Sequence, residues 1–246
     1  MTIPAVPGRR VLLIGGLAAV LVGSVSCSDQ RQGSVDPTPS GACPQSGSFT
    51  ITYIGDSLTS GTDNDSGMTS RFPAIISRRL IVPHRVLASN GSGYVQVGPA
   101  AGARDFPGQA QFVQSDAGLV VIMGSRNDMH SEENIQRVYE RALVTFQSVR
   151  ERAPRARILV VGPPWINDEP SDEIIRVRDE IERAAREAAV DFVDPIQSGW
   201  FAEADGLLED GRSRLIADDR IHPNDAGHAY LADRLLPFIT ERMCSS

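Results

Sequence analysis

The sequence predicts a single α/β domain in which a parallel sheet is covered by helices on both faces. Short apolar segments with the pattern of strands alternate along the chain with longer segments in which apolar residues recur every three or four positions. Some of the strand segments, such as residues 119–123, are apolar throughout, as buried parallel strands are. Alternation of this kind is typical of a three-layer α/β/α domain.

The predicted strands are short runs rich in apolar, β-branched or aromatic residues. They cover residues 49–54, 84–88, 119–124, 157–161 and 191–194. Between and after them the sequence predicts helices, at residues 68–80, from Ser131 to Val149, and at 171–188 and 224–242. The second of these helices has the clearest apolar stripe, formed by Ile135, Val138, Ala142, Phe146 and Val149. This order of elements is flavodoxin-like.

Two connections, residues 94–117 and 196–217, are longer than is usual in a compact domain. Both follow the end of a predicted strand. In an open α/β sheet the carboxyl ends of the strands are where reacting and binding groups collect. Both connections are therefore expected to border a functional site.

Length and charge narrow the range of functions. The 246 residues are enough for one domain with a full core once the amino-terminal segment is removed. The net charge of −7, with no basic stripe, argues against a nucleic-acid partner. No histidine, cysteine and carboxylate group has the spacing of metal ligands, so no metal and no cofactor is predicted.

The amino-terminal segment has the order of a secretory signal. Arg9 and Arg10 precede an apolar run, residues 11–22, which is followed by small residues and Cys27. The run is too short to span a membrane comfortably. The cysteine resembles that of a bacterial lipobox, although Ser24 stands where leucine is expected. We predict a signal peptide over residues 1–27, with a lipid on Cys27 that anchors the protein to the outer face of the cell membrane; simple secretion is the alternative.

A tether and one folded domain are predicted to follow the signal peptide. Residues 28–48 are rich in Ser, Gly, Pro and Gln and carry almost nothing apolar, so they are expected to be flexible. Residues 49–246 form the domain. Cys43 and Cys244 flank it, and disulfides persist outside the cell, so we predict that these two cysteines bond; two free thiols are the alternative.

The first strand ends in Gly55-Asp56-Ser57-Leu58. The chain must turn sharply there, which leaves a serine at the carboxyl end of the sheet with its hydroxyl exposed and its N–H free to bind an anion. The two acidic residues that lie next to candidate site residues, Asp56 and Asp128, are expected to hold their loops through backbone hydrogen bonds.

Two further segments supply partners for this serine. In Asp219-Arg220-Ile221-His222-Pro223 a carboxylate three residues before an imidazole can orient the ring, which leaves Nε2 to take a proton from a serine. The buried strand 119–124 is followed by Asn127, whose amide lies at a second strand end. Together they indicate acyl-transfer chemistry.

These residues resemble the SGNH (GDSL-type) hydrolase family over residues 48–243. The resemblance implies that Ser57 is the nucleophile and that Asp219 and His222 complete a triad. It also implies an oxyanion hole made of the N–H groups of Ser57 and a glycine and the amide of Asn127. Gly93 is favoured for that glycine, because it follows a small residue in its loop, and Gly91 is the alternative. The sequence departs from the family where Ser125 replaces a glycine.

Three residues are candidates for binding substrate. The first two, Trp165 and Trp200, either line the site or pack under loops. The neighbouring Phe201 is not one of the three, because packing under its loop is favoured for it. Arg126 either is a surface charge or meets a substrate carboxylate. His84 and His130 are expected to be solvated loop residues.

The sequence therefore predicts an exported serine esterase that acts on lipid or acylated carbohydrate through an acyl-enzyme. An acyltransferase with the same triad is the nearest alternative. A non-catalytic envelope lipoprotein that binds ligands is the alternative from another class, and the presence of every triad residue argues against it.

Overall fold

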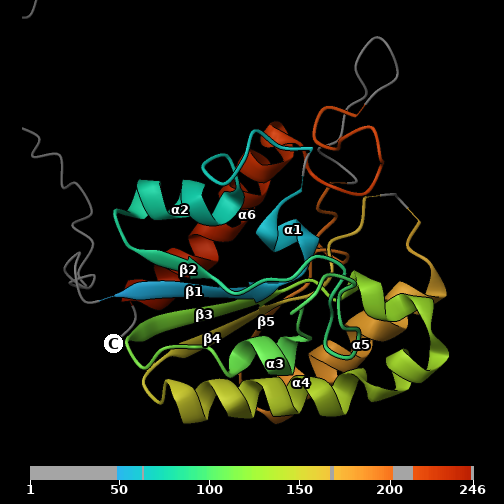
Figure 1. Cartoon of the computed structure of the whole chain (residues 1–246), viewed down its shortest axis with the longest axis horizontal. Coiled ribbons are helices and arrows are strands. Elements are labelled where there is room, and N and C mark those ends of the chain that lie inside the picture. The colour runs from blue at the N-terminus through green and yellow to red at the C-terminus, as the bar shows by residue number, and fades with distance from the viewer. Residues whose placement is uncertain (1–48, 63, 167–168, 202–212, 245–246) are drawn as a thin grey trace, which may run out of the picture. The chain divides into compact units, whose positions relative to one another are not determined.

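The computed structural model describes residues 49–62, 64–166, 169–201 and 213–244. They form a five-stranded sheet with the order β2-β1-β3-β4-β5, in which every neighbouring pair is parallel. Helices cover both faces (Figure 1). The predicted three-layer α/β/α fold is confirmed. The predictions about residues 1–48, which include the signal peptide, Cys27 and Cys43, lie outside the described residues.

The strands lie close to where the sequence predicts them, although the strand predicted at 84–88 ends two residues early. Their bounds are β1 (Thr50–Gly55), β2 (His84–Val86), β3 (Ala117–Met123), β4 (Arg157–Val161) and β5 (Asp191–Val193). Successive side chains of a strand point to opposite faces of the sheet. Val120 and Ile122 of β3 accordingly pack into one apolar cluster, and Leu119, Val121 and Met123 pack into the other.

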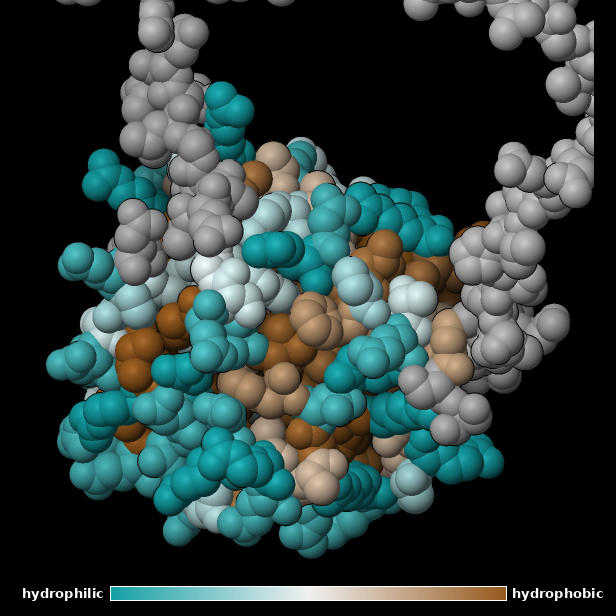
Figure 2. Space-filling view, turned by 180° about the vertical axis from the view of Figure 1, so that it is seen from behind, coloured by the Kyte–Doolittle hydropathy of each residue, from teal (hydrophilic) through white to brown (hydrophobic). Residues whose placement is uncertain are grey.

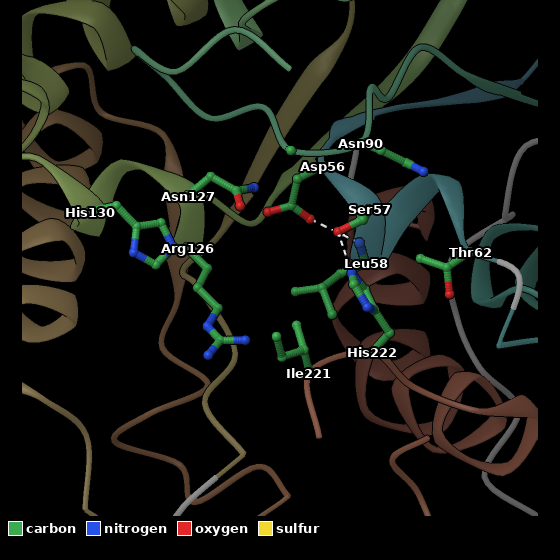
Figure 3. A pocket seen from close by; sticks show the side chains of 11 residues that line it. Asp56, Ser57, Leu58, Thr62, Asn90, Arg126, Asn127, His130, Ile221 and His222 are labelled. Carbon is green, nitrogen blue, oxygen red and sulfur yellow. Dashed lines mark hydrogen bonds between the residues drawn. The ribbon is translucent and has the colours of Figure 1, made fainter. Parts of the chain in front are cut away.

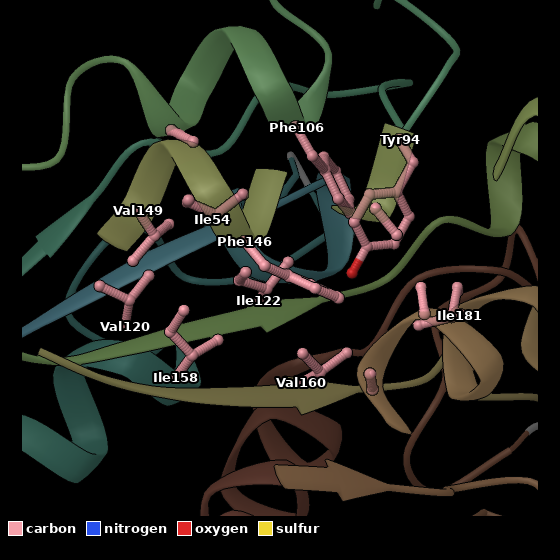
Figure 4. Packing of buried hydrophobic residues seen from close by; sticks show 14 of the residues in the cluster. Ile54, Tyr94, Phe106, Val120, Ile122, Phe146, Val149, Ile158, Val160 and Ile181 are labelled. Atoms are coloured by element: carbon pink, nitrogen blue, oxygen red, sulfur yellow. The ribbon is translucent and has the colours of Figure 1, made fainter. Parts of the chain in front are cut away.

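Three helices cover one face of the sheet: α3 (Phe106–Ala110), α4 (Glu132–Arg152) and α5 (Asp172–Glu187). Their apolar side chains meet those of the strands in the cluster drawn in Figure 4. The predicted stripe of α4 is confirmed, because all five of its residues are buried. Ser131 caps this helix as predicted, and its side chain accepts from the N–H of Asn134.

The opposite face is covered by α2 (Phe72–Leu80) and α6 (Asp225–Cys244). The prediction that the first long helix begins at Met68 is wrong. The helix begins four residues later, where Pro73 stands in its first turn, a position at which the missing N–H of proline costs nothing. Two short helical turns, α1 (Ser57–Ser60) and the 3₁₀ helix η1 (Arg126–His130), lie where β1 and β3 end.

The long connection predicted at 94–117 contains α3. This helix has five residues, too few to show a helical period in the sequence, and its start is capped by the Asp105 carboxylate, which accepts from the N–H of Gly108 at 2.9 Å. Of the other long connection, residues 202–212 lie outside the described part of the chain.

The outer strands of the sheet, β2 and β5, have only three residues each, which limits pairing with other chains. Seen from behind, the domain shows groups of apolar residues across its middle with polar residues around them (Figure 2). None of the helices in the described ranges is long and apolar enough to span a membrane. Cys244 ends α6, but its predicted partner Cys43 is not described, so this disulfide stays a prediction.

Candidate active site

A pocket of about 270 Å³ lies beside the carboxyl ends of β1, β2 and β3 (Figure 3). In the sheet order, β1 stands between β2 and β3, so the chain leaves β1 at the point where the winding of the sheet reverses, the usual place for a ligand site. The residues that line the pocket are Asp56, Ser57, Leu58, Thr62, Asn90, Gly91, Arg126, Asn127, His130, Ile221 and His222.

Ser57 is the first residue of α1 and is held there by the residue before it. Asp56 is 1% exposed, and its carboxylate accepts from the N–H of Leu58 at 2.9 Å and from the N–H of Ser125 at 3.1 Å. The predicted loop-holding role of Asp56 is therefore confirmed. Burial raises the pKa of Asp56 to about 6, although both hydrogen bonds favour the carboxylate.

Gly55 is required by the close approach of its neighbours. A Cβ at this position would lie 2.3 Å from Oγ1 of Thr59 and 2.7 Å from the carbonyl oxygen of Met123. The absence of a side chain lets α1 turn back directly over the end of the sheet. The backbone N–H of Ser57 donates to no acceptor in the described part of the chain, so it is available to a ligand.

The structure brings His222 and Asp219 to this serine. Nδ1 of His222 lies 2.6 Å from Oδ2 of Asp219, and Nε2 lies 2.8 Å from Oγ of Ser57. Figure 3 shows the His222 ring next to the serine, at one side of the pocket. A carboxylate only accepts hydrogen bonds, so Nδ1 carries the hydrogen and Nε2 accepts from the Ser57 hydroxyl.

Asp219 is held as a carboxylate by several donors. Its Oδ1 accepts from the N–H groups of Ile221 and His222, both at 2.9 Å. Partial burial would raise its pKa, but these N–H groups and the His222 ring outweigh that and lower the pKa to about 2. Asp219 is therefore ionised at neutral pH and can orient the imidazole.

Sequence reasoning missed a further donor to this carboxylate. The side-chain amide of Asn64 donates to Oδ2 of Asp219 at 2.8 Å, the same oxygen that faces His222. The two residues are 155 positions apart, and nothing in the sequence links them.

Asn127 reaches the pocket from η1. The preceding turn places Ser125 at a φ of 84°, a left-handed conformation that explains why a glycine is usual there. In this conformation the Ser125 hydroxyl donates to the Asp128 carboxylate at 2.6 Å. The Asn127 amide donates one N–H to the carbonyl of Ser92 at 2.8 Å, which leaves its second N–H for a ligand.

Asp128 holds the loop after β2, as predicted. Its carboxylate accepts from the backbone N–H groups of Tyr94, Val95 and Gln96. It is fully buried, and burial raises its pKa despite these hydrogen bonds.

The preference for Gly93 as an oxyanion donor is wrong. Its N–H donates to the carbonyl of Gln96 at 2.9 Å, and a Cβ on Gly93 would lie 2.3 Å from the Asp128 carboxylate. The residue belongs to the loop that Asp128 holds, and its N–H is already used. The alternative, Gly91, lines the pocket beside Ser57 and Asn127, and its N–H has no acceptor among the described residues.

The three predicted substrate-binding residues have different surroundings. Trp200 is only 3% exposed and packs in the core between the sheet and α6. The prediction that it binds substrate is therefore wrong, and the alternative, packing under a loop, is the one observed. Phe201 is packed there too, as favoured. Trp165 is half-buried behind Arg126, whose guanidinium carbon lies 5.1 Å from the centre of its ring. Arg126 itself lines the pocket.

The other histidines differ from one another. His130 is exposed at the rim of the pocket, as predicted. The prediction that His84 is a solvated loop residue is wrong, because it is half-buried as the first residue of β2. His228 is packed inside the domain, with 1% of its surface exposed. The described residues contain no group of three or more His, Cys, Asp or Glu side chains that could hold a metal ion.

Comparison with known proteins agrees with this geometry. The model of the GDSL-like lipase/acylhydrolase family matches residues 53–230. A GDSL lipase of Mycobacterium tuberculosis is 37% identical over an alignment of 198 residues, which covers 77% of this chain and 81% of that protein.

Solved structures share the fold at lower identity. A family two carbohydrate esterase from Clostridium thermocellum, solved in complex with cellohexaose, has a TM-score of 0.59 and 22% identity over 81% of this chain and 66% of that one. A salicylyl-acyltransferase from a tetracycline biosynthetic pathway has a TM-score of 0.54 and 16% identity over 76% of this chain and 53% of that one. The family match and the identity to the lipase establish that the chain belongs to the GDSL-like lipase/acylhydrolase family and is a carboxylic ester hydrolase.

Proposed function

We propose that this protein is an exported serine esterase in which Ser57, His222 and Asp219 form the catalytic triad. The observation that supports this most is the unbroken contact from Asp219 through His222 to Ser57, at 2.6 and 2.8 Å, beside a pocket. Three side chains of these types in this order are the arrangement that activates a serine hydroxyl.

In the proposed reaction, Nε2 of His222 takes the proton of Ser57 as its oxygen attacks the ester carbonyl. The negative charge on the carbonyl oxygen is stabilised by the N–H of Ser57, the N–H of Gly91 and the free N–H of Asn127. The protonated imidazole, balanced by Asp219, gives its proton to the leaving alcohol. Water then attacks the acyl-enzyme with His222 again as the base, and the acid is released.

The test is Ser57→Ala in the purified domain. Ser57 is only partly buried, so removal of its hydroxyl is expected to leave the fold intact. Hydrolysis of para-nitrophenyl acetate and butyrate should fall to the background rate, while the circular dichroism spectrum and the melting temperature stay those of the wild type. Retained hydrolysis by the variant would refute the assignment of the nucleophile.

The substrate proposed is an ester of a lipid or of a carbohydrate. The lipase relative and the carbohydrate esterases with the same fold support these two classes. An acyltransferase with the same acyl-enzyme is the alternative, and the fold of the salicylyl-acyltransferase is compatible with it. The two are distinguished by whether an added alcohol outcompetes water for the acyl group. Binding without catalysis is the remaining alternative, and the hydrogen-bonded triad argues against it.

Export and anchoring through Cys27 are part of the proposal and are supported by the sequence of residues 9–27. Lipid on Cys27 would attach the domain to the outer face of the membrane through the tether of residues 28–48. Cys27→Ala should move the protein from the membrane fraction of its host to the soluble fraction. Equal distribution of wild type and variant would exclude the anchor.

A further inference from the structure

Arg126 occupies a fixed position in the pocket, directly before Asn127. The residue before it is held by two carboxylates, because the N–H of Ser125 donates to the buried carboxylate of Asp56 and the Ser125 hydroxyl donates to Asp128. In Figure 3 the Arg126 side chain extends into the pocket on the side opposite to Ser57 and His222. A positive charge therefore faces the proposed nucleophile across the space where a substrate would lie.

The guanidinium of Arg126 is half-buried, yet within the described ranges no carboxylate forms an ion pair with it. Its Nε is buried and donates to no acceptor there. Burial lowers the pKa of Arg126, and the carboxylates of Asp56 and Asp219 oppose this only through their charge, without a hydrogen bond. Charged groups that are withdrawn from water normally have a partner.

Other arginines of the domain follow that rule. Four of them have side chains that are 14 to 30% exposed, and each is paired with an aspartate. The pairs are Arg71 with Asp65, Arg141 with Asp105, Arg178 with Asp194, and Arg242 with Asp191. Arg126 differs from these four in that its side chain extends into the pocket (Figure 3) and, within the described ranges, no carboxylate pairs with it.

Trp165 orients the guanidinium. Its ring lies against the guanidinium, with 5.1 Å between the guanidinium carbon and the ring centre, and its Nε1–H donates to the carbonyl of Glu169 at 3.2 Å. Contact with the ring leaves the N–H edge of the guanidinium for a ligand. That edge matches the two oxygens of a carboxylate or a phosphate.

We propose that Arg126 binds an oxyanion on the substrate, a carboxylate or a phosphate, so that the enzyme selects negatively charged esters. The inference rests on the proposed esterase function and names its substrate class. A neutral substrate would leave this partly buried cation without a partner, whereas an anionic substrate would supply one.

The test compares esters that differ in charge and hardly in size. In one pair the charge is in the alcohol part, para-acetoxybenzoate against para-acetoxybenzamide. In the other it is in the acyl part, the mono-para-nitrophenyl ester of adipic acid against para-nitrophenyl hexanoate. We expect the wild type to prefer the anionic member of at least one pair by about tenfold in kcat/KM, the size of one charge-assisted hydrogen bond.

Arg126→Gln should reduce that preference to about one. Arg126→Lys, which keeps the charge and loses the planar fork, should retain part of it. Arg183→Gln is the matched control, since Arg183 lies on α5, stacks on the Tyr139 ring at 3.7 Å and does not line the pocket. Arg183→Gln changes the net charge by the same amount as Arg126→Gln and should leave the preference for anionic esters unchanged. No preference in either pair, or an equal loss in the control, would overturn the proposal.

Calorimetry on Ser57→Ala supplies a readout that does not need turnover. The Ser57→Ala variant should bind benzoate more tightly than benzamide, and the double variant that also carries Arg126→Gln should bind the two equally. Equal binding of benzoate and benzamide by Ser57→Ala alone would overturn the proposal. If neutral esters are cleaved through Ser57 without any charge preference, the substrate class is wrong and the esterase function stands. If no ester is cleaved but benzoate binds through Arg126, the esterase function is wrong and the anion site stands.

Discussion

Two residues that line the pocket, Asp56 and Asn127, also hold neighbouring loops in place through hydrogen bonds. The Asn127 amide uses one N–H to hold the carbonyl of Ser92, and its second N–H is the one proposed to bind the substrate oxygen. Asp56 uses its two oxygens to hold α1 and the turn at Ser125. The donors around Ser57 are thus positioned before a substrate arrives, and preorganised donors are what stabilise a developing negative charge.

Asn127→Ala is expected to lower kcat by a factor on the order of 10²–10³, the usual effect of removing one oxyanion donor. KM should change little, because the lost interaction is strongest with the negatively charged transition state. Steady-state kinetics on para-nitrophenyl butyrate measure both constants. The hydrogen bond to Ser92 is lost as well, so urea unfolding of the variant must be measured beside it; an effect confined to KM would contradict the proposed role.

Residue types and spacing were enough to predict that Ser57, the Asp219–His222 pair and Asn127 lie together, because each lies next to a strand end or within one turn. They were not enough to choose between Gly91 and Gly93. That choice depends on a contact with Asp128, which lies more than thirty residues away. Asn64 was missed for the same reason, since its contact with Asp219 forms only when the loop after α1 meets the loop before α6.

Among the elements, α6 affects both the stability of the domain and the position of His222. It packs on α2, and it begins three residues after His222. Its first turn is fixed by Asp225, which accepts from the N–H of Ser66 at 2.7 Å. His228, one turn further on, stacks on Phe72 of α2 with 6.3 Å between ring centres. Its Nε2 lies 3.5 Å from the Asp65 carboxylate, and its Nδ1 has no hydrogen-bond partner in the described part of the chain.

Burial of His228 lowers its pKa to about 4, although the nearby Asp65 and Asp225 favour the charged form. The unfolded chain, with a histidine pKa of about 6.5, therefore binds more protons between these two values. The free energy of unfolding should fall as the pH falls from about 6.5 to about 4, with His228 contributing up to about 3 kcal/mol of the loss. Above that window its contribution is constant.

His228→Gln should flatten this dependence. Urea unfolding at pH 6.5 and pH 4.5 gives the difference for each protein, which separates the pH effect from any general loss of stability. His130→Gln is the control, because His130 is exposed and the same substitution there removes a solvated ring. An unchanged difference for His228→Gln would show that protonation of this ring does not drive acid sensitivity.

The elements themselves were predictable to different degrees. The stripe of α4 and the apolar core of β3 are long regular patterns, and both were predicted nearly to their ends. By contrast, α3 has only five residues, too few to show a helical period in the sequence. It depends on the Asp105 cap and on packing against α4. The start of α2 was placed too early because Met68 is apolar, yet it is 77% exposed in a turn before the helix.

At the scale of the whole molecule, the pocket is assembled from segments that are far apart in the chain. Ser57 follows β1, Gly91 follows β2, Asn127 follows β3 and His222 precedes α6. The parallel sheet brings these segments to one edge, which is why the fold and the site were predicted together from strand ends. The volume and shape of the pocket depend on side chains from all four segments, and neither was predictable from any one motif.

The pocket volume leads to a prediction about acyl length. At about 270 Å³ it lies below the range of about 300–1,000 Å³ that is usual for drug-sized ligands. Its apolar lining comes mainly from Leu58, which is buried, and from Ile221, which is 40% exposed at the rim. A short acyl chain can be covered by these two side chains, whereas a long one must leave most of its methylene groups in water.

Across para-nitrophenyl esters from acetate to palmitate, kcat/KM should therefore be highest between acetate and hexanoate and fall by at least about tenfold towards palmitate. Each methylene buried contributes about 0.8 kcal/mol, so the rate should rise with chain length only while the chain is still being covered. Ile221→Ala should lower the rate on hexanoate more than on acetate, because acetate does not reach the rim. Exposed Val144 on α4 offers the control Val144→Ala, away from the pocket. A rate that keeps rising to palmitate would mean that a longer apolar surface continues from this pocket and that long-chain lipid esters are the better substrates.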